Sequence, residues 1–181
     1  MLKNRKVATL ICIIVVALSI LGGARRSIRE VIAETESAFV YGVNGDGKSI
    51  YHDLGTRAQL ANNLAAVAER YLDADDSLIQ AVRTNADQLS RETSPSRCYD
   101  LNARLEQSVQ DLNAALLNEP LTETDEGYRE GILTDMTSYA YIISHDGYNE
   151  QVRKLNEETL GVFPANILKY LVFTGEAEYY G

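Results

Sequence analysis

Cysteine and histidine are both scarce in this chain of 181 residues, which contains two of each. Cys12 lies in an apolar run near the start of the sequence, so Cys98 is alone in the remainder and no disulfide within the domain is expected. Without a Cys-x-x-Cys pair, so few thiols and imidazoles do not make a zinc ligand set. We therefore expect neither a disulfide framework nor structural zinc.

Positive charge is also in short supply. The chain has 17 Lys and Arg against 26 Asp and Glu, a formal net charge of −9. The first 24 residues have no acidic side chain and carry three of the positive charges, on Lys3, Arg5 and Lys6, so the rest has 14 basic against 26 acidic residues, or −12. A body this acidic repels phosphate backbones, and we expect no nucleic-acid partner.

The signatures of common catalytic sites are missing too: there is no Gly-x-Ser-x-Gly elbow and no Glu-x-x-His motif of di-iron bundles. Two His-Asp pairs occur, at 52–53 and 145–146, but a metal-dependent phosphohydrolase needs more ligands. We expect the pairs to lie roughly 30 Å apart, the second about twenty residues into a continuous last helix. The sequence predicts no catalytic residue, no cofactor and no enzyme.

An uncharged apolar run, Val7–Ala24, lies in "MLKNRKVATLICIIVVALSILGGARR". As a helix it would span about 27 Å, close to a hydrocarbon core of roughly 30 Å. A secretory signal with a cleavage site at Gly22-Gly23-Ala24 is the alternative. Length favours an anchor, so we expect a single-pass membrane protein that contacts the lipid bilayer through Val7–Ala24.

The flanking charges leave the orientation of that anchor open. Lys3, Arg5 and Lys6 lie on one side of the apolar run, and Arg25, Arg26 and Arg29 lie on the other. With similar positive charge on both sides, the positive-inside rule does not decide which side of the membrane the rest of the chain faces.

Beyond Ala24, apolar residues recur at helical intervals almost throughout, and no long β-alternation occurs. We expect helices at 25–41, 57–72, about 78–91, 101–116 and 128–155, with "DADDS" a kink or a break, Pro95 starting an element and Pro164 ending one. The predicted fold is all-α: an antiparallel up-and-down four-helix bundle (25–181) preceded by one N-terminal transmembrane helix (1–24).

A Gly/Asp-rich loop is predicted at 42–56, and its start, "GVNGDGKS" (42–49), matches the P-loop pattern at Gly42, Gly47, Lys48 and Ser49. A P-loop lies between a buried strand and a helix that begins at the Lys. Here the preceding residues have a helical pattern, and a further glycine follows before the next expected helix. These features disfavour nucleotide binding.

Calcium is the second candidate ligand of this loop, because Asn44, Asp46 and Asp53 supply oxygen donors around a tight turn. With Gly47 at the glycine position of an EF-hand loop, the first ligand is missing and the terminal Glu is shortened to Asp53. A weak calcium site is therefore the alternative to a plain solvated loop between helices.

Two stretches carry a further pattern of residues. In "TRAQLANNLAAVAERYL" (56–72) it consists of Arg57, Leu60, Asn63, Leu64, Val67 and Tyr71. In "YNEQVRKLNEETLGVFPANILKYLVFTGEAEYY" (148–180) it consists of Tyr148, Asn149, Val152, Asn156, Phe163, Pro164 and Phe173. In order and spacing, and together with the N-terminal apolar segment, these residues resemble the LemA family of membrane-anchored bacterial proteins. The family's Pro in the first pattern is replaced by Ala61-Asn62, and the loop at 42–54 looks like an insertion.

The resemblance implies a single-pass protein with a helical bundle and no established catalytic activity. It implies structural roles for Tyr148, Asn149, Asn156 and Pro164, as a polar contact between helices and a helix stop. We therefore expect a scaffold or adaptor for an unknown protein partner, with "EAEYYG" (176–181) either exposed to that partner or frayed. The alternative is a ligand-binding module that uses the 42–53 loop.

Overall fold

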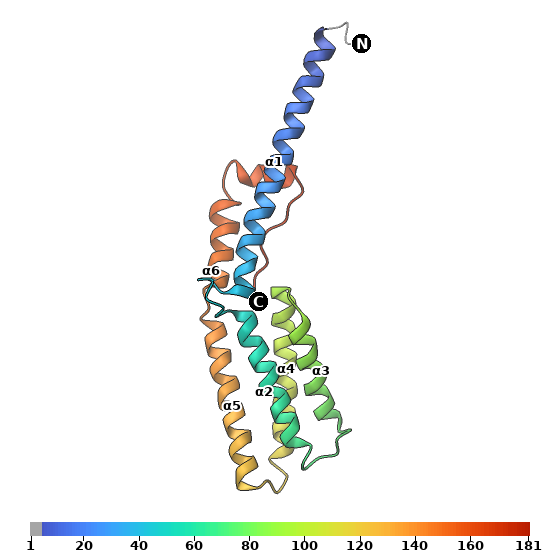
Figure 1. The fold of residues 1–181 in the computed structure, drawn as a ribbon, viewed down its shortest axis with the longest axis vertical. Helices are drawn as coiled ribbons and strands as arrows, with labels where there is room; N and C mark the ends of the chain where they lie inside the picture. The colour runs from blue at the N-terminus through green and yellow to red at the C-terminus, as the bar shows by residue number, and fades with distance from the viewer. Residues whose placement is uncertain (1–4) are drawn as a thin grey trace. The chain divides into compact units, whose positions relative to one another are not determined.

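The described part of the chain, residues 5–181 of a computed structural model, is helical and contains no strand. The all-α prediction is confirmed for these residues; Lys3, used in the orientation argument, lies outside them. In chain order the elements are α1 Arg5–Tyr41, α2 Ile50–Ala68, α3 Ser77–Arg91, α4 Pro95–Leu116, α5 Glu123–Ser144, α6 Tyr148–Arg153, the π-helical turn η1 Lys154–Thr159, and α7 Ala165–Leu171 (Figure 1).

The chain divides into two compact units. The first, which we call the stalk unit, combines the residues up to Ser37 with Glu150–Ala177; the second, the bundle unit, combines Ala38–Asn149 with Glu178–Gly181. Helix α1 runs without a break through residue 24, where the membrane anchor is predicted to end. Each unit is described by itself below.

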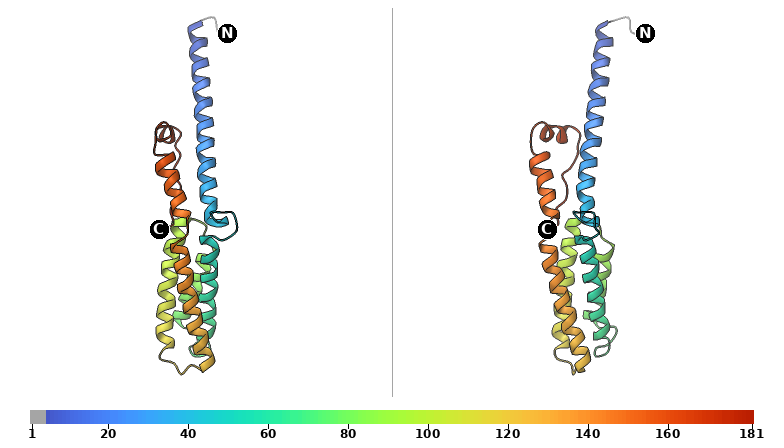
Figure 2. Two further views of the ribbon diagram at one scale, coloured as in Figure 1. Left: turned by 90° about the vertical axis from the view of Figure 1, so that its left-hand side faces the viewer. Right: turned by 60° about the vertical axis from the view of Figure 1, so that its left-hand side comes forward.

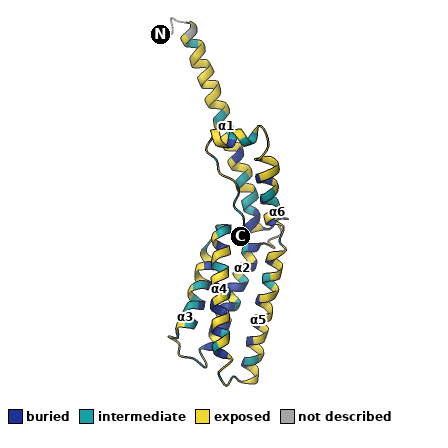
Figure 3. Cartoon of the chain, turned by 180° about the vertical axis from the view of Figure 1, so that it is seen from behind, coloured by how far each residue is buried: buried dark blue, intermediate teal, exposed yellow. Residues whose placement is uncertain are grey.

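The bundle unit is built around α2, which packs against α3, α4 and α5, while α3 also packs against α4. The two views of Figure 2 show these four helices side by side. Their apolar stripes form the core, as Figure 3 shows by the buried residues on the inner faces. The fully buried side chains include Leu54, Leu64, Ile79, Val82, Leu89, Leu105, Val109, Leu112 and Leu116. The predicted stripes are therefore core.

Side-chain caps explain where the bundle helices begin. Asp76 accepts a hydrogen bond from the Leu78 N–H at 2.8 Å and so starts α3. The "DADDS" segment is therefore a break between two helices rather than a kink. Ser94 caps α4, whose first residue is Pro95, as predicted from the sequence. Thr122 caps α5 in the same way.

Two predicted helix boundaries are wrong. Helix α2 begins at Ile50 rather than at 57, because Ser49 caps it and Gly55 is tolerated inside the helix, where a Cβ would meet nothing within 4 Å. The last long helix is interrupted, since α5 ends at Ser144. The Asp146 carboxylate accepts a hydrogen bond from the Tyr148 N–H at 2.7 Å, which helps a new helix to start there.

In the stalk unit, the first half of α1 has no cover. Large apolar side chains between Val7 and Ile20 are 44% to 64% exposed, and a window of 18 residues has a mean hydropathy of 2.6 with none of it buried. Among the described helices, α1 is the one long and apolar enough to cross a membrane, a test that a signal sequence also passes. The predicted apolar N-terminal helix is thus confirmed at this level.

The second half of α1 is covered on one face, where Leu21, Ala24 and Ile28 are partly or fully buried. Helix η1 ends at Thr159, before the predicted stop at Pro164, and the apolar segment after Pro164 forms the short helix α7. Figure 1 shows α7 level with the middle of α1.

Candidate functional site

The predicted ligand loop, residues 42–49, is a tight turn held by its own backbone. Gly42, Gly45 and Gly47 all have positive φ, at +85°, +66° and +77°. The Gly47 N–H donates to the Tyr41 carbonyl at 3.0 Å. A Cβ at Gly42 would lie 2.3 Å from the Lys48 carbonyl oxygen, so the backbone path itself requires glycine here.

The P-loop pattern lies in a setting unlike that of a nucleotide site. The residues before Gly42 belong to helix α1, where a P-loop has a buried strand. The Ser49 hydroxyl, which would bind magnesium in a P-loop, donates to the Val40 carbonyl at 2.9 Å and accepts from the His52 N–H at 3.1 Å. The glycines and Ser49 thus serve the turn between α1 and α2.

The calcium candidates lie in two elements. Asn44 and Asp46 belong to the loop, whereas Asp53 lies in the first turn of α2. The Asp46 carboxylate accepts a hydrogen bond from the Lys48 N–H at 3.1 Å, which closes the turn. Within residues 5–181, no group of three or more His, Cys, Asp or Glu side chains is arranged to hold a metal ion. Calcium binding at the loop stays a prediction.

The two His-Asp pairs are closer than predicted. Burial raises the pKa of Asp53, and the negative charge of Asp146 raises it further, while His52 lowers it. Gly147 lies beside Val43, since a Cβ added there would be 3.6 Å from the Val43 side chain. The predicted separation of roughly 30 Å is therefore wrong. The second pair lies at the end of α5, which returns to the end of the bundle unit where α2 begins.

A cavity with both polar and apolar lining residues lies near that end and was not anticipated from the sequence. Its volume is about 300 Å³, and its lining includes Arg57, Asn102 and Tyr180. The Arg57 side chain is 3% exposed and forms an ion pair with Glu106. Its Nε and the Asn102 Oδ1 are buried without a partner among the described atoms. One donor and one acceptor at a single cavity suit a small polar guest, of which water is the smallest.

The C-terminal tail forms part of this site. The Tyr148 hydroxyl donates to the Glu178 carbonyl at 2.6 Å. The Asn149 amide donates to the Tyr180 carbonyl at 2.8 Å and accepts from its N–H at 2.9 Å. Burial raises the pKa of Tyr180 to about 12, so its phenol stays protonated at neutral pH. The expectation of an exposed or frayed "EAEYYG" is therefore wrong, because asparagine pairing fixes the tail.

The same pairing occurs within the stalk unit. The Asn156 side chain donates to the Ala177 carbonyl and accepts from the Ala177 N–H, both at 2.9 Å. Asn156 and Ala177 are both buried. Tyr148 and the two asparagines thus make polar contacts, but these contacts run to an extended tail rather than to another helix, as was expected.

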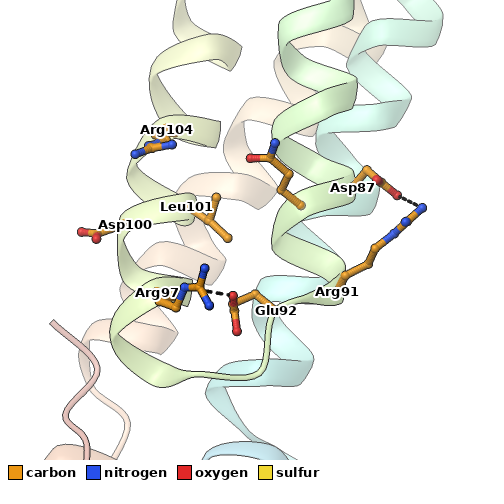
Figure 4. Close-up of a pocket in the computed structure, with 8 residues that line it drawn as sticks. Asp87, Arg91, Glu92, Arg97, Asp100, Leu101 and Arg104 are labelled. Atoms are coloured by element: carbon orange, nitrogen blue, oxygen red, sulfur yellow. Dashed lines mark ion pairs between the residues drawn. The ribbon is translucent and has the colours of Figure 1, made fainter.

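A surface hollow lies between α3 and α4 (Figure 4). It has a volume of about 560 Å³ and is lined by Asp87, Gln88, Arg91, Glu92, Arg97, Asp100, Leu101 and Arg104. Ion pairs join Arg91 to Asp87 at 2.7 Å and Arg97 to Glu92 at 3.3 Å. Backbone N–H groups of Ser94 and Thr93 hold the pKa of Glu92 below its ordinary value. The lining of this open hollow is balanced in charge, with three basic and three acidic side chains.

Comparison with known proteins adds no relative: no family model, no curated protein and no solved structure matches the chain. The likeness to the LemA family therefore stays a resemblance.

Proposed function

We propose that this chain is a single-pass membrane protein of the LemA type, without catalytic activity, in which α1 anchors an acidic helical scaffold or adaptor. The scaffold is an antiparallel, up-and-down four-helix bundle of α2 to α5. Their mutual packing and the short connections at 69–76, 92–94 and 117–122 support this arrangement.

The observation that carries the proposal is the bare apolar half of α1. Nine large apolar side chains between Val7 and Ile20 are exposed, and burying such a side chain is worth about 1.5–3 kcal/mol each. Water-soluble monomers rarely expose a continuous patch of this kind. A lipid bilayer supplies the missing cover, and its hydrocarbon core has the thickness that the run spans.

A role in protein contacts is supported by the surface of the bundle unit. Tyr41, Tyr128 and Tyr141 are each more than half exposed. Two acidic residues, Glu126 and Glu130, lie two positions before and after Tyr128 in α5. Tyrosine is enriched where proteins meet, because its ring buries area while its hydroxyl stays hydrated. Because the chain beyond residue 24 is acidic, the partner that we propose is a protein with a basic contact surface.

Membrane extraction tests the anchor. The full chain, tagged at its C-terminus, should stay in the membrane after alkaline carbonate treatment and have its uncleaved mass. Ile14→Asp should release it, because a charge at the centre of a spanning helix costs about 3 kcal/mol, whereas Tyr128→Asp in the bundle unit should not. Recovery of a soluble chain cleaved near Ala24 would instead establish the secretory-signal alternative.

Site-specific photo-crosslinking tests the adaptor role. A photoreactive phenylalanine analogue at Tyr128 or Tyr141 should give a crosslinked partner in membranes, and the same group at the buried Tyr148 should give none. Equal products at all three positions, or none at the exposed ones, would argue against a binding surface on α5.

A calcium-binding module is the second candidate. One observation favours it: Asp53 and Asp146 repel each other, and a bound cation would relieve that repulsion. A ligand at a hundred times its dissociation constant stabilises by about 2.7 kcal/mol, a shift of several degrees. Calcium should then raise the melting temperature of the wild type but not of Asp46→Asn/Asp53→Asn. No shift in either protein would remove this candidate, and a shift that requires Mg·ATP would favour the nucleotide interpretation.

A further inference from the structure

Helix α7 has its polarity reversed. Its outward side chains Ile167, Tyr170 and Leu171 are 52%, 73% and 56% exposed. Its one charged residue, Lys169, is buried and forms an ion pair with Glu176. A helix in water does the opposite, with its apolar stripe inward and its charges outward. The pattern is that of a helix whose outer face does not meet bulk water.

The residues on either side of α7 extend the same apolar surface. Val162, Phe163 and Phe173 are 51%, 78% and 85% exposed. Within α7, Tyr170 and Leu171 follow Ile167 by three and four residues, so these three side chains lie on one face of the helix. Phe163 precedes Ile167 by four residues. We call Val162–Phe173 the apolar cap of the stalk unit. Among its twelve residues, the exposed large apolar side chains are two phenylalanines, a tyrosine and three aliphatic residues.

The position of the apolar cap along α1 is given by burial. Residues 9–20 of α1 are all exposed, whereas Leu21, Ala24 and Ile28 are partly or fully covered. In the stalk unit, this cover comes from residues 150–177. Figure 1 and both views of Figure 2 place α7 level with the middle of α1, near where the cover starts. The apolar cap therefore lies where the uncharged run Val7–Ala24 ends.

That level is the edge of the bilayer if α1 spans it. The run Val7–Ala24 fills the hydrocarbon core, and the next residues, Arg25 and Arg26, are exposed and suited to lipid phosphates. Aromatic side chains are enriched at this boundary, because their rings tolerate both hydrocarbon and headgroups. Apolar helix faces also lie in the same layer in amphipathic membrane-surface helices.

We infer that the apolar cap, Val162–Phe173, is a second membrane contact that lies in the headgroup layer of the bilayer crossed by α1. This inference rests on the proposed function, because it uses α1 to locate the bilayer. The continuity of the apolar cap with the spanning run identifies a lipid surface as its occupant. The apolar cap would fix the stalk unit against the bilayer through two separate segments of the chain.

The absence of tryptophan makes a direct experiment possible, since any tryptophan introduced into the chain is a unique reporter. We would prepare Phe163→Trp, Phe173→Trp, Leu18→Trp and Tyr128→Trp in the full chain. Each would be reconstituted in phosphatidylcholine–phosphatidylglycerol vesicles whose lipids carry bromine near the headgroups or near the bilayer centre. Tyr128, 57% exposed on α5, is the matched control outside the stalk unit.

The expected result is a blue-shifted emission at 163 and 173 that headgroup-proximal bromine quenches more than central bromine. Leu18→Trp should be quenched most by central bromine, and Tyr128→Trp by neither. Quenching at 18 without quenching at 163 or 173 would overturn the inference while the anchor stands. No quenching at any position would overturn the proposed anchor itself. Blue-shifted but unquenched emission at 163 would mean that a second copy of the chain covers the apolar cap, which also overturns the inference.

Discussion

Helices α3 and α7 show opposite uses of an amphipathic pattern within one chain. Helix α3 buries Ile79, Val82, Ala86 and Leu89 and turns its charged residues outward. Helix α7 buries Lys169 and turns its apolar residues outward. The first pattern is that of a helix between a core and water, and the second is that of a helix between a polar contact and an apolar medium. The membrane contact that we infer for α7 rests on this difference between the two helices.

The largest expected difference between these helices is in packing energy. Ile79→Ala removes a fully buried side chain and should cost about 3 kcal/mol, which lowers the melting temperature by roughly 6–12 °C. Ile167→Ala removes an exposed side chain and should change stability by less than about 0.5 kcal/mol. Thermal unfolding of the full chain in detergent, followed by circular dichroism, measures both. An equal loss would mean that the outer face of α7 is packed against protein.

Two of the buried cations sharpen the comparison. Arg57 and Lys169 each pair with a carboxylate that is about half exposed, Glu106 and Glu176. Glu106→Ala should cost about 2–3 kcal/mol, because it leaves a buried guanidinium unpaired, although the exposed partner site admits some water. Glu176→Ala should cost less than about 1 kcal/mol, since the long lysine side chain can extend its ammonium group to water. Urea unfolding of both variants, with Glu106→Gln as the isosteric control, tests this order.

The contact between Asn156 and Ala177 in the stalk unit should contribute less to the free energy of unfolding. Asn156→Ala leaves the buried N–H and carbonyl of Ala177 unpaired and should cost about 1–2 kcal/mol. Amide hydrogen exchange at Ala177 should accelerate accordingly, while exchange in α3 stays unchanged. Unaltered protection at Ala177 would mean that the tail is held by other contacts.

The smallest expected effect concerns Asp53 and Asp125, two carboxylates of the bundle unit whose pKa values are shifted in opposite directions. A raised folded-state pKa at Asp53 means that stability falls as pH rises above the ordinary value of 3.8. Asp53→Asn should therefore stabilise at neutral pH, and the gain should vanish near pH 4 and below. A hydrogen bond from Tyr71 is the main cause that lowers the pKa of Asp125, so Asp125→Asn should destabilise at neutral pH and less in acid. Melting temperatures across pH test both signs; equal pH profiles for the two variants would contradict the opposed shifts.

The apolar stripes and the start of α4 could be predicted from the sequence because they depend on neighbours along the chain. Leu105, Val109 and Leu112 face inward at helical spacing, and Ser94 with Pro95 starts α4. In contrast, Gly55 suggested a loop inside what is the second turn of α2. Its helix is fixed by the Ser49 cap and by packing against three other helices, which local propensity does not reveal.

The parts of the candidate site that the sequence did not reveal all depend on contacts between residues that are far apart in the sequence. The Arg57–Glu106 pair joins residues 49 apart, and Asn149 meets Tyr180 across 31 residues. Asp146 approaches Asp53 only because α5 stops at Ser144, which an apparently continuous helical pattern concealed. The sequence shows that the segment after Pro164 is apolar. Only the structure shows that its apolar side chains are exposed while Lys169 is buried.

The division of the chain into units has a consequence for biosynthesis. The stalk unit joins residues before 38 to residues after 149, and the bundle unit is encoded almost entirely between them. A ribosome that adds about 5–20 residues per second therefore delivers the bundle helices several seconds before the segment that covers the second half of α1. For the membrane anchor that we propose, this interval lets α1 enter the bilayer while its Ile28 face is still bare. On that proposal, the order of synthesis favours insertion of α1 before the stalk unit closes on it.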